Sequence, residues 1–176
     1  NDQLRTNKNH RLNLTLDHKI DSLNSIKWTN SVGYNLSNSS LNGLNQTTSQ
    51  AGNPENDGKR LTNSDGTAMT LSSNLLWRHR FHKKGRTLST NLTLNLNNDD
   101  SKGNLQALNR YFRTDGSVLR SDTIQQNNSQ VSYSNSFGGT FSYTEPIGKR
   151  KYLEARYAFN RSINDVNREV FDVRKD

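Results

Sequence analysis

The chain has 176 residues and a net charge of +8, and only 29% of its residues are apolar, or about 35% when its 11 glycines are counted. Soluble globular domains reach roughly 45–50% when glycine is counted, so this composition argues against a large two-sided core and against a doubly wound α/β fold. The sequence contains no cysteine, which excludes disulfides, thiolate metal ligands and a thiol nucleophile. No apolar run is long enough for a transmembrane helix.

Strict alternation of apolar and polar residues predicts six β-strands, because successive side chains of a strand point to opposite faces. We expect an all-β fold of antiparallel, up-and-down strands, each about 10–14 residues long and able to span a membrane. The residues that alternate with the apolar ones, which we call the polar parity, are mostly Asn, Ser, Thr and Arg. In chain order, the apolar parity is carried by Leu12, Leu14 and Leu16; by Trp28, Val32, Tyr34 and Leu36; by Met69, Leu71, Leu75, Trp77 and Phe81; by Leu88, Leu92, Leu94 and Leu96; by Val131, Tyr133, Phe137, Phe141 and Tyr143; and by Leu153, Ala155, Tyr157, Phe159 and Ile163.

The connections between these strands are of two kinds. Short turns rich in Asp, Asn, Gly, Ser or Pro are predicted at 21–25, 82–86 and 145–151. Long polar stretches at 38–66 and 98–126 alternate with them and are predicted as loops. Within the second stretch, Leu105–Arg113 and Val118–Ile124 could instead extend strands or form a hairpin around Asp115-Gly116. Tight turns on one side and long loops on the other are typical of outer-membrane barrels. We therefore expect a partial transmembrane β-barrel with short periplasmic turns and long extracellular loops.

Four aromatic residues on the apolar parity lie within a few residues of a short turn. Trp28, Trp77, Phe81 and Tyr143 would form one aromatic girdle at the membrane interface. Alternatively, they would cover the core of a soluble β-sheet.

The order of several short motifs resembles the barrel region of TonB-dependent-receptor-like outer membrane proteins of Bacteroidetes (the outer membrane β-barrel family). The motifs are Asn9-His10-Arg11-Leu12-Asn13-Leu14, Asp21-Ser22-Leu23-Asn24-Ser25, His82-Lys83-Lys84-Gly85-Arg86-Thr87-Leu88-Ser89, Tyr143-Thr144-Glu145-Pro146-Ile147-Gly148 and Leu153-Glu154-Ala155-Arg156-Tyr157. The ordered set covers nearly the whole chain.

The resemblance implies a location in the bacterial outer membrane and a receptor that imports a nutrient. The family has a closed barrel of about twenty-two strands, an N-terminal plug and energy from the TonB machinery. Six strands are too few to close, so we expect residues 1–176 to be a fragment of one barrel domain whose plug and remaining strands lie outside this chain. Expected partners are outer-membrane lipid, TonB through the absent plug, and a surface lipoprotein or other complex subunits.

Three arginines on the polar parity would then face the lumen. We hypothesise that Arg78, Arg80 and Arg156 hold the plug through its carboxylates. The alternative is that they pair with acidic neighbours such as Glu154 on adjacent strands. Two other functions stay open for the chain: an outer-membrane barrel for adhesion or export, and a soluble β-sandwich binding module.

No catalytic constellation emerges, and we expect the protein not to be an enzyme. The four histidines, His10, His18, His79 and His82, do not cluster with acidic residues. Glu145 before Pro146 is interpreted as part of a turn, paired with a turn cation such as Lys149 or Arg150, and Asp99-Asp100 lacks the ligand spacing of a calcium loop. We expect no cofactor, no metal ion and no nucleic-acid partner.

Overall fold

The computed structural model describes residues 1–50 and 52–173. Within this part of the chain every regular element is a strand, and there is no helix that could span a membrane. The six strands are β1 (Asp2–Lys19), β2 (Asn24–Thr48), β3 (Pro54–Arg80), β4 (Thr87–Phe112), β5 (Val118–Gly148) and β6 (Lys151–Asp172).

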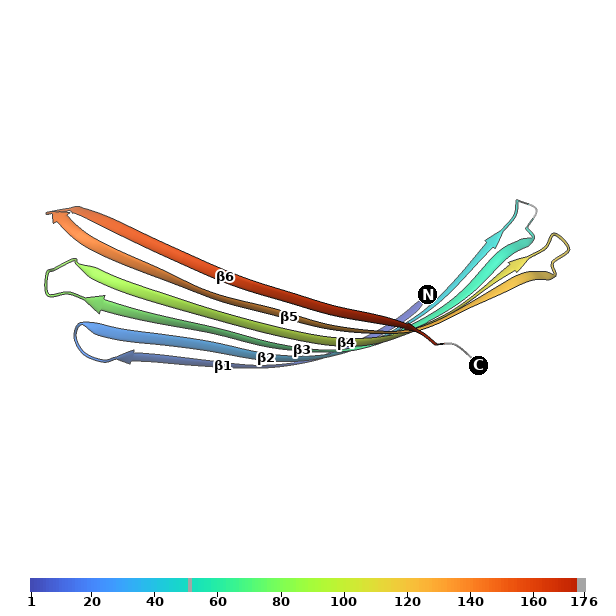
Figure 1. Cartoon of the computed structure of the whole chain (residues 1–176), viewed down its shortest axis with the longest axis horizontal. Coiled ribbons are helices and arrows are strands. Elements are labelled where there is room, and N and C mark those ends of the chain that lie inside the picture. The colour runs from blue at the N-terminus through green and yellow to red at the C-terminus, as the bar shows by residue number, and fades with distance from the viewer. Residues whose placement is uncertain (51, 174–176) are drawn as a thin grey trace.

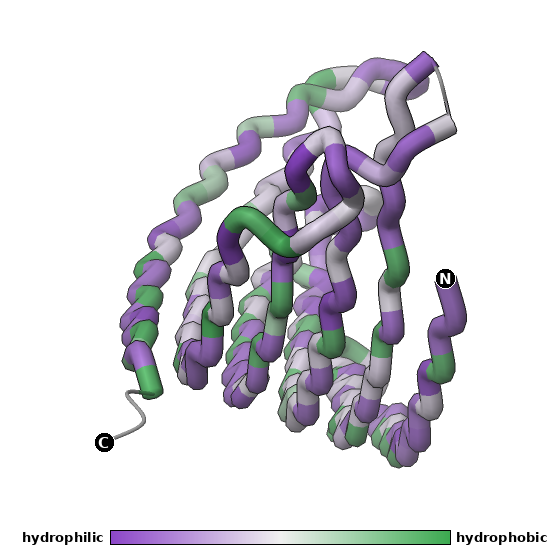
Figure 2. The backbone as a smooth tube through the Cα atoms, turned by 90° about the vertical axis from the view of Figure 1, so that its right-hand side faces the viewer, coloured by the Kyte–Doolittle hydropathy of each residue, from purple (hydrophilic) through white to green (hydrophobic). Residues whose placement is uncertain are grey.

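All six strands belong to one open antiparallel sheet in the order β1-β2-β3-β4-β5-β6. Three turns lie at one end of this sheet and two at the other, and the sheet bends along its strands (Figure 1). It is a single curved layer (Figure 2), and none of the described hydrophobic side chains is buried. The all-β, up-and-down prediction is confirmed. A sandwich needs two sheets packed face to face, so these strands alone do not form the β-sandwich considered as an alternative.

The two long polar stretches are mostly paired strands, so their prediction as loops is wrong, whereas the alternative that Leu105–Arg113 and Val118–Ile124 extend strands is confirmed. Residues 38–48 of β2 pair with 54–65 of β3, and residues 98–112 of β4 pair with 118–133 of β5. The strands are consequently 18 to 31 residues long. Backbone pairing needs no apolar side chain, and cross-strand hydrogen bonds such as Ser40 Oγ to Asn63 Oδ1 (2.8 Å) bind these polar residues to each other.

The closing turns have specific local chemistry. At the end of the sheet that has two turns, the 113–117 turn confirms the hairpin around Asp115-Gly116: Ser117 N donates to Asp115 Oδ1 (2.8 Å), and Gly116 has a φ of 81°. At the end with the three short turns, Asp21 Oδ1 accepts from the backbone N of Leu23 (2.6 Å) and of Asn24 (2.7 Å). The third short turn is tighter than predicted, because β5 extends to Gly148 and leaves only residues 149–150 between the strands.

The register gives the sheet two chemically different faces. Residues paired across strands share a face of the sheet. The apolar residues predicted above for each of the six strands all lie on the same face. We call it the belt face; it carries Leu14, Trp28, Leu75, Leu94, Phe137 and Phe159. The opposite, polar face carries Asn13, Thr29, Asn74, Asn95, Ser136 and Asn160. The alternation of hydropathy along each strand is visible in Figure 2.

Candidate functional site

The belt face has an apolar belt that crosses all six strands near the short turns. Along β5 it extends from Tyr143 to Tyr133, and on the other strands it covers the residues paired with this segment. None of its side chains is fully buried, and about half are exposed: Leu12 is 69% exposed, Phe137 47% and Tyr157 65%. The belt contains Leu12, Leu14, Leu16, Ile26, Trp28, Val32, Tyr34, Met69, Leu71, Leu75, Trp77, Leu88, Leu92, Leu94, Leu96, Tyr133, Phe137, Phe141, Tyr143, Ala155, Tyr157, Phe159 and Ile163.

The predicted girdle residues lie at the edge of the belt nearest the short turns. Trp77 stacks on His79 with ring centroids 5.9 Å apart, and Phe81 contacts the edges of His79 (4.5 Å) and Tyr143 (6.2 Å). Trp28 lies two residues along the strand from the level of Trp77, further into the belt, and its Nε1 donates to Ser73 Oγ (3.0 Å). The structure thus gathers Trp77, Phe81 and Tyr143 into one continuous aromatic cluster. Its role at a lipid interface stays a prediction.

A second aromatic level lies at the other edge of the belt. Tyr34 pairs with Met69, Met69 with Asn98, and Asn98 with Tyr133, so both tyrosines lie at one level of the sheet. Tyr34 is 42% exposed and Tyr133 46%. Sequence reasoning assigned both residues to strands and missed this level. The ten-residue interval between Tyr133 and Tyr143 (143 − 133) was a usable indication in the sequence.

Polar side chains interrupt the belt at most of its levels, and charged Asp165 lies at the level of Tyr133. At the level of Leu94, the row reads Leu14, Asn30, Ser73, Leu94, Phe137 and Arg161. The Ser73 hydroxyl oxygen accepts a hydrogen bond from Trp28 Nε1. Arg161 lies on the edge strand β6 and forms no ion pair with a described residue.

Aromatic rings cover a glycine in the middle of the belt. Gly139 faces Phe159 on β6, and a Cβ built on Gly139 would lie 2.5 Å from Phe159 Cε1 and 3.2 Å from Leu92 Cδ2. The Phe159 ring also lies 5.6 Å from that of Phe137 and 6.5 Å from that of Phe141. Glycine is therefore required here for close packing of the ring against the sheet.

An ion cluster at the short turns joins the second turn to the third. Arg86 donates to Glu145 through Nε (2.6 Å to Oε2) and Nη2 (2.8 Å to Oε1), Lys83 Nζ donates to Oε1, and the Tyr143 hydroxyl donates to Oε2 (2.7 Å). The pKa of the Glu145 carboxyl is held well below its usual value, first by Arg86 and then by Lys83 and Tyr143. The predicted pairing of Glu145 with Lys149 or Arg150 is wrong, because the neighbouring turn brings two cations closer.

The first turn is bonded to the same cluster. Asn24 donates through Nδ2 to Asp21 Oδ2 (2.8 Å), and its Oδ1 lies 2.7 Å from Nδ1 of His79. His79 contacts Phe81, and the Arg86 guanidinium lies 5.8 Å from the centre of the Phe81 ring. These contacts connect all three short turns and keep them in fixed register.

The polar face carries the three arginines singled out in the sequence. Arg78 and Arg80 on β3 and Arg156 on β6 lie on this face near the short turns, and Arg78 and Arg156 share a level. None of them pairs with an acidic residue in the described ranges, Glu154 included. The row of paired residues that contains Arg78 and Arg156 crosses all six strands and is cationic and rich in hydroxyl groups. It consists of Lys19, Ser25, Arg78, Ser89, Ser142 and Arg156.

The polar face is hollowed at the level of the belt. A depression of about 450 Å³ lies over β1 to β4, and another of about 340 Å³ lies over β4 to β6. Small side chains and glycines such as Gly138 line them. The residues of the polar face that line the first are Asn13, Thr15, Thr29, Ser31, Ser72, Asn74, Thr93 and Asn95.

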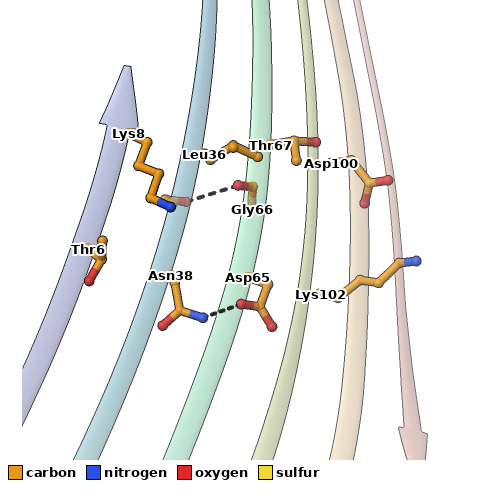
Figure 3. A pocket seen from close by; sticks show the side chains of 10 residues that line it. Thr6, Lys8, Leu36, Asn38, Asp65, Gly66, Thr67, Asp100 and Lys102 are labelled. Carbon is orange, nitrogen blue, oxygen red and sulfur yellow. Dashed lines mark hydrogen bonds between the residues drawn. The ribbon is translucent and has the colours of Figure 1, made fainter. Parts of the chain in front are cut away.

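Beyond the belt, the belt face becomes polar and charged. A depression of about 490 Å³ lies directly past the level of Tyr34 and Tyr133, with Leu36 on its belt side (Figure 3). Its charged side chains are Lys8, Asp65, Asp100 and Lys102. Within the described residues no group of three or more His, Asp or Glu side chains is placed to hold a metal ion.

No protein-family model matches the sequence, and no curated protein matches it. Among solved structures, the chain is similar to Clostridium perfringens delta-toxin, with 8% sequence identity and a TM-score of 0.19 over 89% of this chain and 96% of that chain. A TM-score this low carries no argument about fold or function.

Proposed function

We propose that this chain forms part of the wall of an outer-membrane β-barrel that belongs to a TonB-dependent transporter importing a nutrient. The observation that carries the membrane assignment is the apolar belt between two aromatic levels. Outer-membrane barrels have an apolar band about 25 Å tall, flanked on both sides by aromatic girdles.

The height of the belt supports this assignment. Tyr133 and Tyr143 are ten residues apart (143 − 133) on β5, which corresponds to about 34 Å along a strand. Strands of such barrels tilt by roughly 35–45°, and this tilt reduces the height across the bilayer to about 24–28 Å. The two aromatic levels are thus spaced as the two interfaces of a membrane would require.

The two faces support the same arrangement. The belt face would contact lipid, and the hollowed polar face, with its small Ser, Thr, Asn and Gly residues, would line the lumen. An exposed apolar sheet with two open edges is an aggregation hazard in water. Lipid and further strands would remove that hazard, because a closed barrel has no edge.

The assignment to TonB-dependent import rests on the resemblance of the ordered motifs. In this arrangement the fragment supplies wall, lumen surface and the hairpins outside the membrane, and gating belongs to a plug in the longer protein. Arg78, Arg80 and Arg156 would face the lumen near the short-turn end. Their lack of partners in the described residues leaves them available for plug carboxylates.

The experiment takes the full-length protein from the native envelope and asks two questions in sequence. Recovery in outer-membrane fractions, with extraction only by detergent, is expected; recovery in the soluble fraction would refute the membrane assignment. The extracted protein is then tested for binding to the isolated periplasmic domain of TonB. Membrane recovery without TonB binding would leave the barrel standing and favour adhesion or export instead of import.

A further inference from the structure

The end of the sheet with the three short turns carries nearly all of the excess positive charge of the chain (Figure 1). Residues 19–25, 78–86 and 145–156, which are the short turns and the strand ends that adjoin them, contain 10 Lys and Arg against 3 Asp and Glu, a net charge of +7 (10 − 3). The rest of the chain contains 14 Lys and Arg against 13 Asp and Glu, a net charge of +1 (14 − 13). The two ends of the strands therefore differ in the balance of sign and not only in the number of charges.

Four of these cations lie on two adjacent turns and form no ion pair with a described residue. One lies in the turn between β3 and β4, two form the turn between β5 and β6, and the fourth begins β6. The two turns are in contact, because Lys83 Nζ donates to the carbonyl oxygen of Pro146 (3.3 Å). We call the four cations the collar; they are Lys84, Lys149, Arg150 and Lys151.

The carboxylate that lies between these turns is already occupied. Glu145 accepts hydrogen bonds from Arg86, from Lys83 and from the Tyr143 hydroxyl, and its side chain is only 21% exposed. It therefore neutralises Arg86 and Lys83 and is not open to a ligand. The collar is left with positive charge alone, so it attracts anions and repels ammonium groups.

The collar lies directly past the aromatic cluster. Phe81 precedes the turn that contains Lys84, and β5 ends at Gly148, five residues beyond Tyr143 (148 − 143). Five residues extend about 17 Å along a strand, or about 12–14 Å across the bilayer at a tilt of 35–45°. The headgroup layer is about 5–8 Å deep on each side of the hydrocarbon, and the Debye length is about 8–10 Å. With the aromatic level at the interface, Lys84 lies among the headgroups and Lys149 within one Debye length of them.

Exposed apolar side chains accompany the collar on the belt face. Leu153, which pairs with Glu145, is 60% exposed, and Ile147 in the last turn of β5 is 61% exposed. An apolar side chain beside a free ammonium group suits a lipid, which presents an acyl chain next to its phosphate. It suits a free anion in water less well.

We propose that the collar binds the phosphate groups of anionic phospholipids in the leaflet on the short-turn side of the membrane, which the proposed function identifies as the periplasmic one. The ammonium and guanidinium groups of the collar donate to the phosphate oxygens. The acyl chains continue over Leu153 and Leu88 into the belt. This inference rests on the proposed function, since it requires the belt to be in lipid.

The test uses the full-length protein reconstituted into nanodiscs that contain equal amounts of phosphatidylglycerol and phosphatidylethanolamine. The lipids that stay bound after extraction are counted by mass spectrometry. A basic side chain near an anionic membrane surface corresponds to a preference of about fivefold, so we expect phosphatidylglycerol to be retained about fivefold over phosphatidylethanolamine. Equal retention of both lipids, or an excess of phosphatidylethanolamine, overturns the inference.

Matched substitutions locate the preference on the molecule. Lys84→Gln/Lys149→Gln should lower it to below about twofold. Lys59→Gln/Arg60→Gln removes the same charge, but Lys59 pairs with Leu44, ten residues beyond the level of Tyr34 (44 − 34), about 34 Å along the strand from the belt. This control should leave the preference unchanged, and an equal loss in both variants would refute a site at the short turns. Lys84→Arg/Lys149→Arg keeps the charge and should keep the preference; its loss there would show that charge is not the cause.

The failure of this inference is distinguishable from failure of the proposed function. A protein that does not enter nanodiscs and stays monodisperse without detergent contradicts the membrane assignment, and the collar is rejected with it. A protein that inserts but retains both lipids equally contradicts the collar alone, and an acidic protein then becomes the expected partner of the short turns.

Discussion

A charge placed at the middle of the belt face should destabilise the protein far more than the same charge one residue away. Leu94 pairs with Phe137, which is six residues from Tyr143 and four from Tyr133 (143 − 137 and 137 − 133), so Leu94 lies near the midpoint between the two aromatic levels. An arginine at the midplane of an outer-membrane barrel costs about 2–4 kcal/mol, and one near the interface about 0–1 kcal/mol. We therefore expect Leu94→Arg to cost about 2–4 kcal/mol and Leu88→Arg, at the level of Tyr143, about 0–1 kcal/mol.

The measurement is reversible urea unfolding of the full-length protein in lipid vesicles, with both variants and a control on the other face. Asn95→Arg is that control: Asn95 neighbours Leu94 in sequence but lies on the polar face, where its Nδ2 donates to Ser136 Oγ (3.2 Å). Its loss should be limited to that hydrogen bond, roughly 0.5–1.5 kcal/mol. The reasoning is refuted if Leu88→Arg costs as much as Leu94→Arg, because a protein core has no dependence on membrane depth.

Three further substitutions test other parts of the structure. Arg161→Leu should stabilise the protein in vesicles by about 2–4 kcal/mol if this mid-belt side chain faces lipid; destabilisation would show that a polar partner covers it. Gly139→Ala should cost about 1–3 kcal/mol, because its Cβ displaces the Phe159 ring, and an unchanged urea midpoint would contradict this packing. For Glu145, the depressed pKa means that its contribution is present above the ordinary value of 4.5 and is lost as the pH falls below it; the melting temperature should fall more between pH 7 and pH 3 in the wild type than in Glu145→Gln, whereas equal falls would exclude the Arg86 contact as the cause.

The arginines of the polar face illustrate how far a position can be predicted without its contacts. Their parity placed Arg78, Arg80 and Arg156 on one face, and the register confirms this placement. Pairing with Glu154 was an open alternative, and the structure shows no such ion pair. Parity follows from the two-residue period of a strand, but a contact depends on the offset between strands, which no single segment encodes.

Glu145 shows the same limit for the candidate site. Its position before Pro146 indicated a turn, and nearby cations in the sequence suggested Lys149 or Arg150 as partners. The actual partners, Arg86 and Lys83, precede it by 59 and 62 residues. In an antiparallel sheet, successive hairpins place their turns side by side, so residues far apart in the chain become nearest neighbours.

What the sequence determined by itself is the all-β fold, the strand parity and the positions of the three short turns, because each depends on residues within a few positions of one another. The apolar parity of Leu92, Leu94 and Leu96 is one example. Only the tertiary structure decided the length of the strands beyond the belt, since polar residues give no periodic pattern there and pairing with the neighbouring strand orders them. The register likewise decided that Tyr34 and Tyr133 share a level and that Asp100 and Lys102 lie beyond it. That alignment across strands creates both the belt and the charged depression at its edge.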